Sequence, residues 1–143
     1  MNETIVNFGY PDSVVATYTH WVVLLRPQQV TLGSLVLAAT SQARNLHELD
    51  GAAFTELGRV VADIETTLQT EFGYQKINYL MLMMVDPHVH YHVIPRYESS
   101  KEFGGVSFED QSWPGPPALN LVTPTTADLN EQLKAQLRGR WPA

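Results

Sequence analysis

One long amphipathic segment in the middle of the chain constrains the fold more than any other feature. Between Asp50 and Gly73, apolar residues recur at spacings of three and four, so they form a single stripe on a helix. The stripe consists of Phe54, Leu57, Val60, Val61, Ile64 and Leu68. Asp50 is a suitable N-cap, and Gly73 stands where a helix commonly ends. The pattern predicts one long helix whose apolar face must be covered by another layer.

Strand-like segments flank this helix on both sides. Residues 17–26 and 33–40 precede it, are rich in apolar and β-branched residues, and are joined by a polar turn. Residues 76–84 and 88–97 follow it and are joined by the short turn at 85–87. Short connections join antiparallel neighbours. The predicted fold class is therefore α+β, with an antiparallel sheet of about five strands packed on one long helix and a short C-terminal helix.

Proline and glycine mark the remaining segments. Pro95 cannot donate a ladder hydrogen bond, so we expect it at a sheet edge or a bulge. Residues 104–120 contain three glycines and three prolines and should be irregular. The capping pattern Thr125-x-x-Asp128 precedes three regularly spaced leucines and predicts a helix that ends at Gly139.

Length, charge and composition exclude several classes of protein. The chain has 143 residues, which suits one domain, and we expect a catalytic part in 1–105 and a C-terminal wrap and helix in 106–143. The formal charge of -6 argues against a nucleic-acid or anionic-membrane binder. The absence of cysteine excludes disulfides, thiolate metal sites and a cysteine nucleophile. No signal-peptide pattern is present, and the longest apolar run, Tyr79–Val85, is too short to span a membrane, so we expect a soluble cytoplasmic protein.

Three of the five histidines lie within five residues, as His88, His90 and His92. On a strand, alternate side chains point to the same face, so the three imidazoles would form one row while Val89, Tyr91 and Val93 face the other side. An imidazole row on one face and an apolar row on the other is typical of a strand that lines a pocket.

Metal binding is one interpretation of the row, because histidine is a common metal ligand. Spacing weighs against all three histidines serving one ion, since His88 and His92 would lie roughly 13 Å apart along a strand. Two neighbouring histidines could bind an ion with help from Asp86, His20 or His47, but the sequence indicates no third ligand.

Nucleophilic catalysis on a phosphate ester or anhydride is the other interpretation. A neutral imidazole is nucleophilic near pH 7, and its phosphorus adduct can be hydrolysed. The nucleophile needs its second ring nitrogen held as a donor, and it needs neighbouring donors for the developing charge. A middle histidine flanked by two others meets these needs without a metal.

The segment from His88 to Arg96, HVHYHVIPR, resembles the signature of the histidine triad (HIT) superfamily, His-x-His-x-His followed by two apolar residues. The similarity extends over roughly Val14 to Tyr97, because the hairpin, the long helix and the strand before the triad occur in the order of that family. The resemblance implies a HIT-like fold, a homodimer, and a hydrolase or transferase that acts on nucleotide conjugates such as nucleoside phosphoramidates or dinucleoside polyphosphates. It also implies that no metal or other cofactor is needed.

The resemblance assigns roles to the three histidines. His90 would be the nucleophile and form a nucleotidyl-histidine intermediate, with its second ring nitrogen donating to the backbone carbonyl of His88. His92 would contact the phosphate and protonate the leaving group, and His88 would orient the nucleophile. The candidate substrate-binding residues are Arg26, Asn78, Ser34 and Arg96.

The chain departs from the family pattern in three places. The segment Leu82–Asp86 lacks the glycine and amide that commonly hold phosphates before the triad. Arg26 stands near the position of an asparagine that contacts ribose, and Ser34 replaces a histidine. Arg26 could pair with a phosphate instead or be a surface arginine.

Three hypotheses therefore remain for the function. The first is a metal-independent nucleotide hydrolase with His90 as nucleophile. The second is a nucleotide-binding module with little turnover, since the usual phosphate-holding stretch is missing. The third is a protein that binds a metal through two of the three histidines.

Overall fold

The computed structural model describes residues 1–142 and confirms the predicted α+β class, with a five-stranded antiparallel sheet, one long helix and a C-terminal helix. The sequence does not predict the short N-terminal helix, the first strand, the 3-10 turn before the long helix or the small hairpin after the sheet. In chain order the elements are α1 (Glu3–Asn7), β1 (Val14–Thr17), β2 (Trp21–Leu25), β3 (Leu35–Ala39), the 3-10 turn η1 (Leu46–Glu48), α2 (Gly51–Phe72), β4 (Lys76–Leu80), β5 (His90–Arg96), β6 (Lys101–Phe103), β7 (Val106–Phe108) and α3 (Ala127–Arg140).

The main sheet has the strand order β1-β2-β3-β5-β4, and β6 pairs with β7 in a separate two-stranded sheet. Strand β5 therefore lies between β3 and β4. Its residue His92 pairs with Val36 of β3 on one side and with Leu80 of β4 on the other. The pairing with β3 ends at Val93. Pro95 lies beyond that end, where β5 has only β4 as a neighbour, and this is the local edge that a proline requires.

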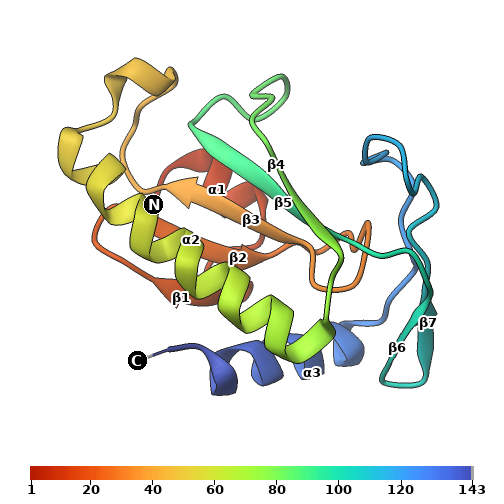
Figure 1. Ribbon diagram of the computed structural model, residues 1–143. Helices are drawn as coiled ribbons and strands as arrows, with labels where there is room; N and C mark the ends of the chain where they lie inside the picture. The colour runs from red at the N-terminus through yellow and green to blue at the C-terminus, as the bar shows by residue number, and fades with distance from the viewer. Residues whose placement is uncertain (143) are drawn as a thin grey trace.

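The two faces of the sheet are covered by helices of very different length (Figure 1). Helix α2, 22 residues long, crosses one face, and the five-residue α1 lies behind the sheet on the other. Alternate residues of the strands pack into two clusters. The larger cluster, on the α2 face, includes Trp21, Val23, Leu35, Leu37, Val60, Ile64, Leu68 and Val93. The smaller one, on the α1 face, consists of Ile5, Val22, Leu24, Val36 and Ala38.

Helix α2 begins and ends where the sequence predicts. Asp50 is its N-cap, and Gly73 ends it in the left-handed conformation, with φ of 62°. Val60, Ile64 and Leu68 are fully buried, as the stripe predicts. The assignment of Phe54 to the buried stripe is wrong, because Phe54 lies at the flank of the stripe and its side chain is 44% exposed.

Several predicted strand boundaries are wrong. The expected strand 17–26 shortens to β2, because its first residues form the turn at 18–20, and the expected strand 33–40 shortens to β3. The strand predicted over 76–84 ends at Leu80, and Met83, with φ of 46°, has a left-handed conformation that no strand accommodates. The last strand begins at His90 rather than at His88.

The C-terminal part also differs in detail from the prediction. Residues 101–108 form a hairpin around Gly104 and Gly105, both with positive φ, so the start of the segment 104–120 is not irregular as predicted. The N-cap of α3 is Thr126 rather than Thr125, and the helix continues through Gly139 to Arg140. No helix within residues 1–142 is long and apolar enough to cross a membrane.

Candidate functional site

His90 and His92 lie on the α1 face of β5, almost fully buried. Their backbone partners on β3, Ala38 and Val36, belong to the small cluster on that face. The two imidazoles lie edge to face, with ring centroids 5.0 Å apart and an interplanar angle of 80°. The predicted alternation therefore brings these two rings together on one face of the sheet.

His88 precedes the strand, so the expectation of three histidines within one strand is wrong for this residue. Its ring is nevertheless buried and turned toward α1, where Nδ1 lies 2.9 Å from the hydroxyl oxygen of Thr4. Its backbone carbonyl oxygen lies 2.7 Å from Nδ1 of His90. The expected contact between the middle histidine and the carbonyl of the first histidine is thus present.

This contact defines the tautomer of the His90 ring. A carbonyl oxygen can only accept a hydrogen bond, so Nδ1 of His90 is the donor. In the neutral ring the lone pair is therefore on Nε2. The geometry leaves His90 with one nitrogen held by the backbone and one nitrogen available for attack.

The His92 ring lacks the hydrogen bond that holds Nδ1 of the His90 ring. Its Nδ1 atom is buried and has no hydrogen-bond partner among the described residues. Burial, followed by the neighbouring His90 and Arg26, lowers the pKa of His92 to about 4, whereas Asp86 acts in the opposite direction. His92 is therefore neutral at pH 7 in the free protein.

Phe8, directly after α1, covers both rings. Its centroid lies 5.5 Å from that of His90 and 5.8 Å from that of His92. Such tilted and edge-on contacts between aromatic rings are favourable. No motif in the sequence singles out Phe8, because a single aromatic residue near the N-terminus carries no pattern.

A cavity of about 340 Å³ opens beside the two histidines, within the size range of small-molecule sites. One wall is apolar, formed by the loop between β4 and β5 together with side chains from both ends of the chain. The full lining is Phe8, Arg26, Leu82, Met83, Met84, Val85, Asp86, His90, His92 and Leu119. Leu119 comes from the segment after β7 and, like Phe8, was not predicted.

Arg26 contributes the positive charge of this cavity. Its Nη1 donates to the carbonyl of Gln28 at 2.5 Å, while its Nε is buried and has no partner within residues 1–142. Burial lowers the pKa of the guanidinium from its ordinary value. Arg26 is partly buried and lies at the cavity wall with His90 and His92.

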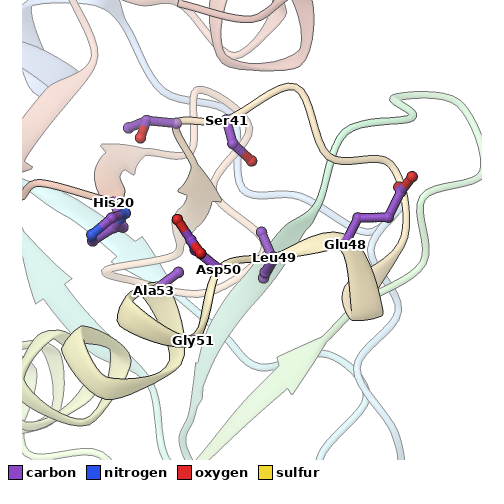
Figure 2. A pocket seen from close by; sticks show the side chains of 8 residues that line it. His20, Ser41, Glu48, Leu49, Asp50, Gly51 and Ala53 are labelled. Atoms are coloured by element: carbon purple, nitrogen blue, oxygen red, sulfur yellow. The ribbon is translucent and has the colours of Figure 1, made fainter.

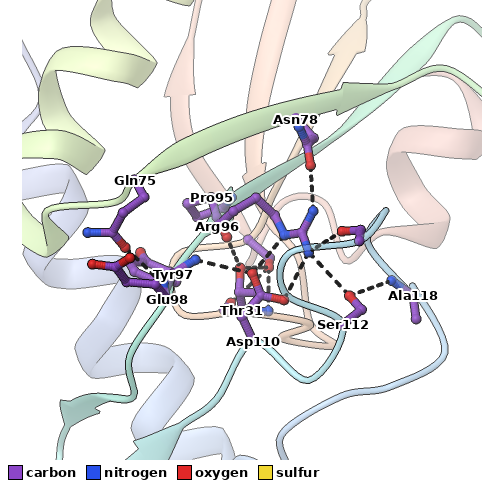
Figure 3. A network of polar contacts seen from close by, with 12 residues as sticks. Thr31, Gln75, Asn78, Pro95, Arg96, Tyr97, Glu98, Asp110, Ser112 and Ala118 are labelled. Carbon is purple, nitrogen blue, oxygen red and sulfur yellow. Dashed lines mark hydrogen bonds and ion pairs between the residues drawn. The ribbon is translucent and has the colours of Figure 1, made fainter.

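Asn78 and Arg96 lie elsewhere, in a network at the far end of β5 (Figure 3). Arg96 is four residues beyond His92, which is roughly 13 Å along a strand. Its guanidinium forms a buried ion pair with Asp110, with Nε 2.7 Å from the carboxylate, and donates to Asn78 at 2.8 Å and to the carbonyl of Gly115 at 2.8 Å. These two candidates do not line the histidine cavity, and the ion pair fixes the end of the strand.

Ser34 also lies away from the cavity. It is fully buried in the turn between β2 and β3, where its hydroxyl donates to the carbonyl of Thr31 at 2.8 Å and accepts from the Thr31 N–H at 3.0 Å. A turn role accounts for both hydrogen bonds, so Ser34 does not join the other candidates.

His20, one of the helpers considered for a metal, lines a separate pocket of about 420 Å³ at the start of α2 (Figure 2). Glu48 and Asp50 are the acidic residues of that pocket. Within residues 1–142, no group of three or more histidine or acidic side chains is arranged to hold a metal ion. The interpretation as a metal site thus gains no third ligand from the structure.

The family model that matches this chain is the HIT domain, over residues 9–99. The chain belongs to the HIT family. Membership places it in a superfamily of nucleotide-binding proteins and nucleotide hydrolases, some of whose members are not enzymes. No curated protein matches the chain by sequence.

Three solved structures with the same fold are distant from this chain in sequence. A histidine triad protein from Marinobacter aquaeolei VT8 is 22% identical, with a TM-score of 0.76 over 99% of this chain and 94% of that one. A histidine triad protein from Sinorhizobium meliloti 1021 is 20% identical, with a TM-score of 0.75 over 98% and 95%. A hypothetical histidine triad nucleotide-binding protein from Sulfolobus tokodaii strain 7 is 18% identical, with a TM-score of 0.70 over 96% and 88%. At these identities the likeness shows the fold alone.

Proposed function

We propose that this HIT protein is a metal-independent hydrolase of nucleotide conjugates, either nucleoside phosphoramidates or dinucleoside polyphosphates. The observation that carries the proposal is the 2.7 Å contact between Nδ1 of His90 and the carbonyl of His88, which leaves Nε2 of His90 with its lone pair beside the cavity. The catalytic residues in this proposal are His90, His92 and His88, and Arg26 binds the phosphate.

In the first step, Nε2 of His90 attacks the α-phosphorus and forms a nitrogen–phosphorus bond. The bond from phosphorus to the leaving group breaks, and the leaving nitrogen or oxygen departs with the electron pair and takes up a proton. The His90 ring becomes cationic in this adduct. Its Nδ1–H donates to the carbonyl of His88, which stabilises the positive charge.

In the second step, water attacks the same phosphorus. The nitrogen–phosphorus bond breaks, and its electron pair returns to Nε2 of His90. The proton lost by the water passes to solvent, and a nucleoside monophosphate leaves the cavity. The ring of His90 is then restored to its starting state.

His92 supplies the proton for the leaving group in this proposal. It is neutral in the free protein, and a neutral imidazole is a weak acid. A phosphate anion bound beside it favours the imidazolium and raises its pKa. Substrate binding therefore prepares His92 to act as the acid.

Arg26 is the cationic partner for the substrate phosphate. Its buried Nε lacks a hydrogen-bond partner, and a phosphate oxygen would supply one. The apolar wall contributed by Leu82, Met83 and Met84 would contact the base or the leaving group.

A nucleotide-binding module with little turnover is the second candidate. It is favoured by the loop from Leu82 to Asp86, which has neither the glycine nor the amide of the family pattern. The Sulfolobus relative is named a nucleotide-binding protein, which fits either candidate. A protein that binds a metal through two histidines is the third.

We also propose that the protein is a homodimer. Strand β4 is an edge of the sheet, and beside it Leu37, Leu57, Val61, Tyr79 and Tyr91 line an apolar groove of about 200 Å³. An unpaired edge beside an apolar groove suits a second copy of the same chain. Sedimentation equilibrium should give twice the mass of the chain, and a monomer at micromolar concentration would contradict this part of the proposal.

The decisive experiment is a steady-state assay in EDTA that compares wild type, His90→Ala and the control His47→Ala, whose side chain is exposed in η1. The substrates are an adenosine phosphoramidate, a guanosine phosphoramidate and diadenosine tetraphosphate. We expect nucleoside monophosphate from wild type and His47→Ala and none from His90→Ala. Equal turnover by His90→Ala would overturn the mechanism.

Two further outcomes would select the other candidates. Nucleotide binding without product would favour the binding module. Activity that EDTA abolishes, together with stoichiometric metal in protein purified without an affinity tag, would favour the metal-binding candidate.

A further inference from the structure

The N-terminal residues 2–8 lie outside the segment that matches the HIT family, yet they contact every histidine of the triad. Asn2 anchors this segment to the sheet. Its side-chain amide donates to the carbonyls of Ala39 at 2.9 Å and Ser41 at 2.8 Å, and its Oδ1 accepts from the N–H of Ile5. The anchored helix places Thr4 against His88.

The hydroxyl of Thr4 makes two hydrogen bonds to His88. The backbone N–H of His88 donates to the hydroxyl oxygen at 3.1 Å, and Nδ1 of the His88 ring lies 2.9 Å from the same oxygen. Thr4 is fully buried, so both partners are removed from solvent. A threonine in a helix commonly turns its hydroxyl to its own backbone, whereas this one reaches a residue 84 positions away.

The directions of these bonds follow because the Thr4 hydroxyl can accept one hydrogen bond and donate another at the same time. The hydroxyl oxygen accepts a hydrogen bond from the backbone N–H of His88, and among the described residues Nδ1 of His88 is the one acceptor in contact with its hydrogen, so the buried O–H donates to Nδ1. Nδ1 is therefore an acceptor, and the proton of the neutral His88 ring is on Nε2. His88 is held at its backbone and at its ring by one side chain.

The carbonyl of the same residue holds Nδ1 of the His90 ring. Thr4 therefore acts on His90 through His88, since a shift of the His88 backbone moves the carbonyl that orients the His90 ring. We propose that Thr4 is a positioning residue for the triad, and that the N-terminal helix is part of the active site. The effect on turnover rests on the proposed function, whereas the effect on the His88 ring does not.

The tests compare Thr4→Val, which removes the hydroxyl at nearly constant volume, with Thr4→Ser, which keeps it. Ile5→Val is the matched control, because it trims an apolar side chain in the same helix that contacts no histidine hydrogen bond. Thr4→Val should lower kcat about 10-fold with KM changed less than about twofold, since a small misplacement of a catalytic group affects the chemical step more than binding. Thr4→Ser and Ile5→Val should keep kcat within about twofold of wild type.

Nitrogen-15 NMR of the imidazoles gives a readout that needs no turnover. In the neutral ring of wild type and Thr4→Ser, His88 should be the tautomer protonated at Nε2. In Thr4→Val it should become a mixture of the two tautomers. A His88 ring protonated at Nδ1 in wild type would overturn the proposal even if Thr4→Val fails to fold.

The two readouts separate this inference from the proposed function. Wild-type kcat in a folded Thr4→Val variant would overturn the positioning role. Absence of turnover in wild type, with the expected His88 tautomer and its change in Thr4→Val, would contradict the proposed hydrolase and support the role of Thr4 in holding the triad.

Discussion

Lowering the pH from 7 to 5 should destabilise wild type more than a variant in which His92 is replaced by glutamine. The pKa of His92 is lowered from 6.5 to about 4 in the folded protein, first by burial and then by His90 and Arg26. Between pH 6.5 and about pH 4 the unfolded chain binds more protons than the folded chain, so the free energy of unfolding falls as the pH falls. The stabilisation is fully present above pH 6.5 and is lost as the pH approaches 4.

The size of the effect follows from the same difference in pKa. Each pH unit between the unfolded and folded pKa of His92 changes the free energy of unfolding by about 1.4 kcal/mol. This gives a loss of about 2 kcal/mol between pH 7 and pH 5 as an upper value. The ring faces a cavity that water can enter, and this screening reduces the expected effect to about 1 kcal/mol. One kcal/mol is measurable for a chain of this size.

Urea unfolding, followed by tryptophan fluorescence at pH 7, 6 and 5, gives the required free energies. Every other titratable residue is present in both wild type and His92→Gln, so the difference between the two proteins reports on His92. His47→Gln, at an exposed histidine, is the control and should follow wild type. An equal loss of stability in wild type and His92→Gln between pH 7 and pH 5 would refute the argument that His92 is buried in the neutral form.

Three further predictions concern stability. Asp110→Asn removes the carboxylate of the buried ion pair with Arg96 and should lower the free energy of unfolding by about 3 kcal/mol in urea; a loss below about 1 kcal/mol would contradict a desolvated pair. Gly33→Ala should cost about 1 to 3 kcal/mol, because Gly33 has φ of 85° and a Cβ there would lie 2.9 Å from the ring of Phe72. Gly58→Ala, in α2 with open space around it, should instead raise the melting temperature.

The parts of the fold that the sequence predicts are those with a local pattern. Helix α2 has a periodic stripe between Asp50 and Gly73, and both ends are placed correctly. The hairpin at Gly104 and Gly105 also has a local signal, the pair of glycines between Phe103 and Val106, and the density of proline and glycine after it obscured that signal. The break between β1 and β2 has none, because the turn at 18–20 contains neither glycine nor proline.

The site divides in the same way. His90 and His92 are found from alternation along one strand, which is a local property. Arg96 continues the same alternation, but four residues of extended chain carry it out of the cavity, and the buried Asp110 determines its role there. Sequence spacing alone does not show whether a residue on the same face of the strand reaches the cavity. It also does not show whether an arginine binds substrate or stabilises the fold.

Thr4 is beyond the reach of sequence patterns for another reason. Its contact with His88 joins residues 84 positions apart, and a single threonine near the N-terminus has no periodicity. What the sequence does contain is Asn2, whose side chain caps α1 by accepting from the N–H of Ile5. An N-cap at that position indicates a short helix, but only the contacts of Thr4 and Phe8 in the structure show that this segment lies over the histidines.

The unequal helices on the two faces of the sheet explain how a site can exist in so small a protein. Helix α2 is long enough to cover its face, and the residues beneath it form a closed core. Helix α1 has five residues and covers only part of the opposite face, so His90 and His92 are buried against Phe8 while a cavity stays open beside them. Phe8 and Leu119, from opposite sides of the family-matched segment, complete its wall. The cavity beside the triad is therefore shaped in part by segments that the family match does not include.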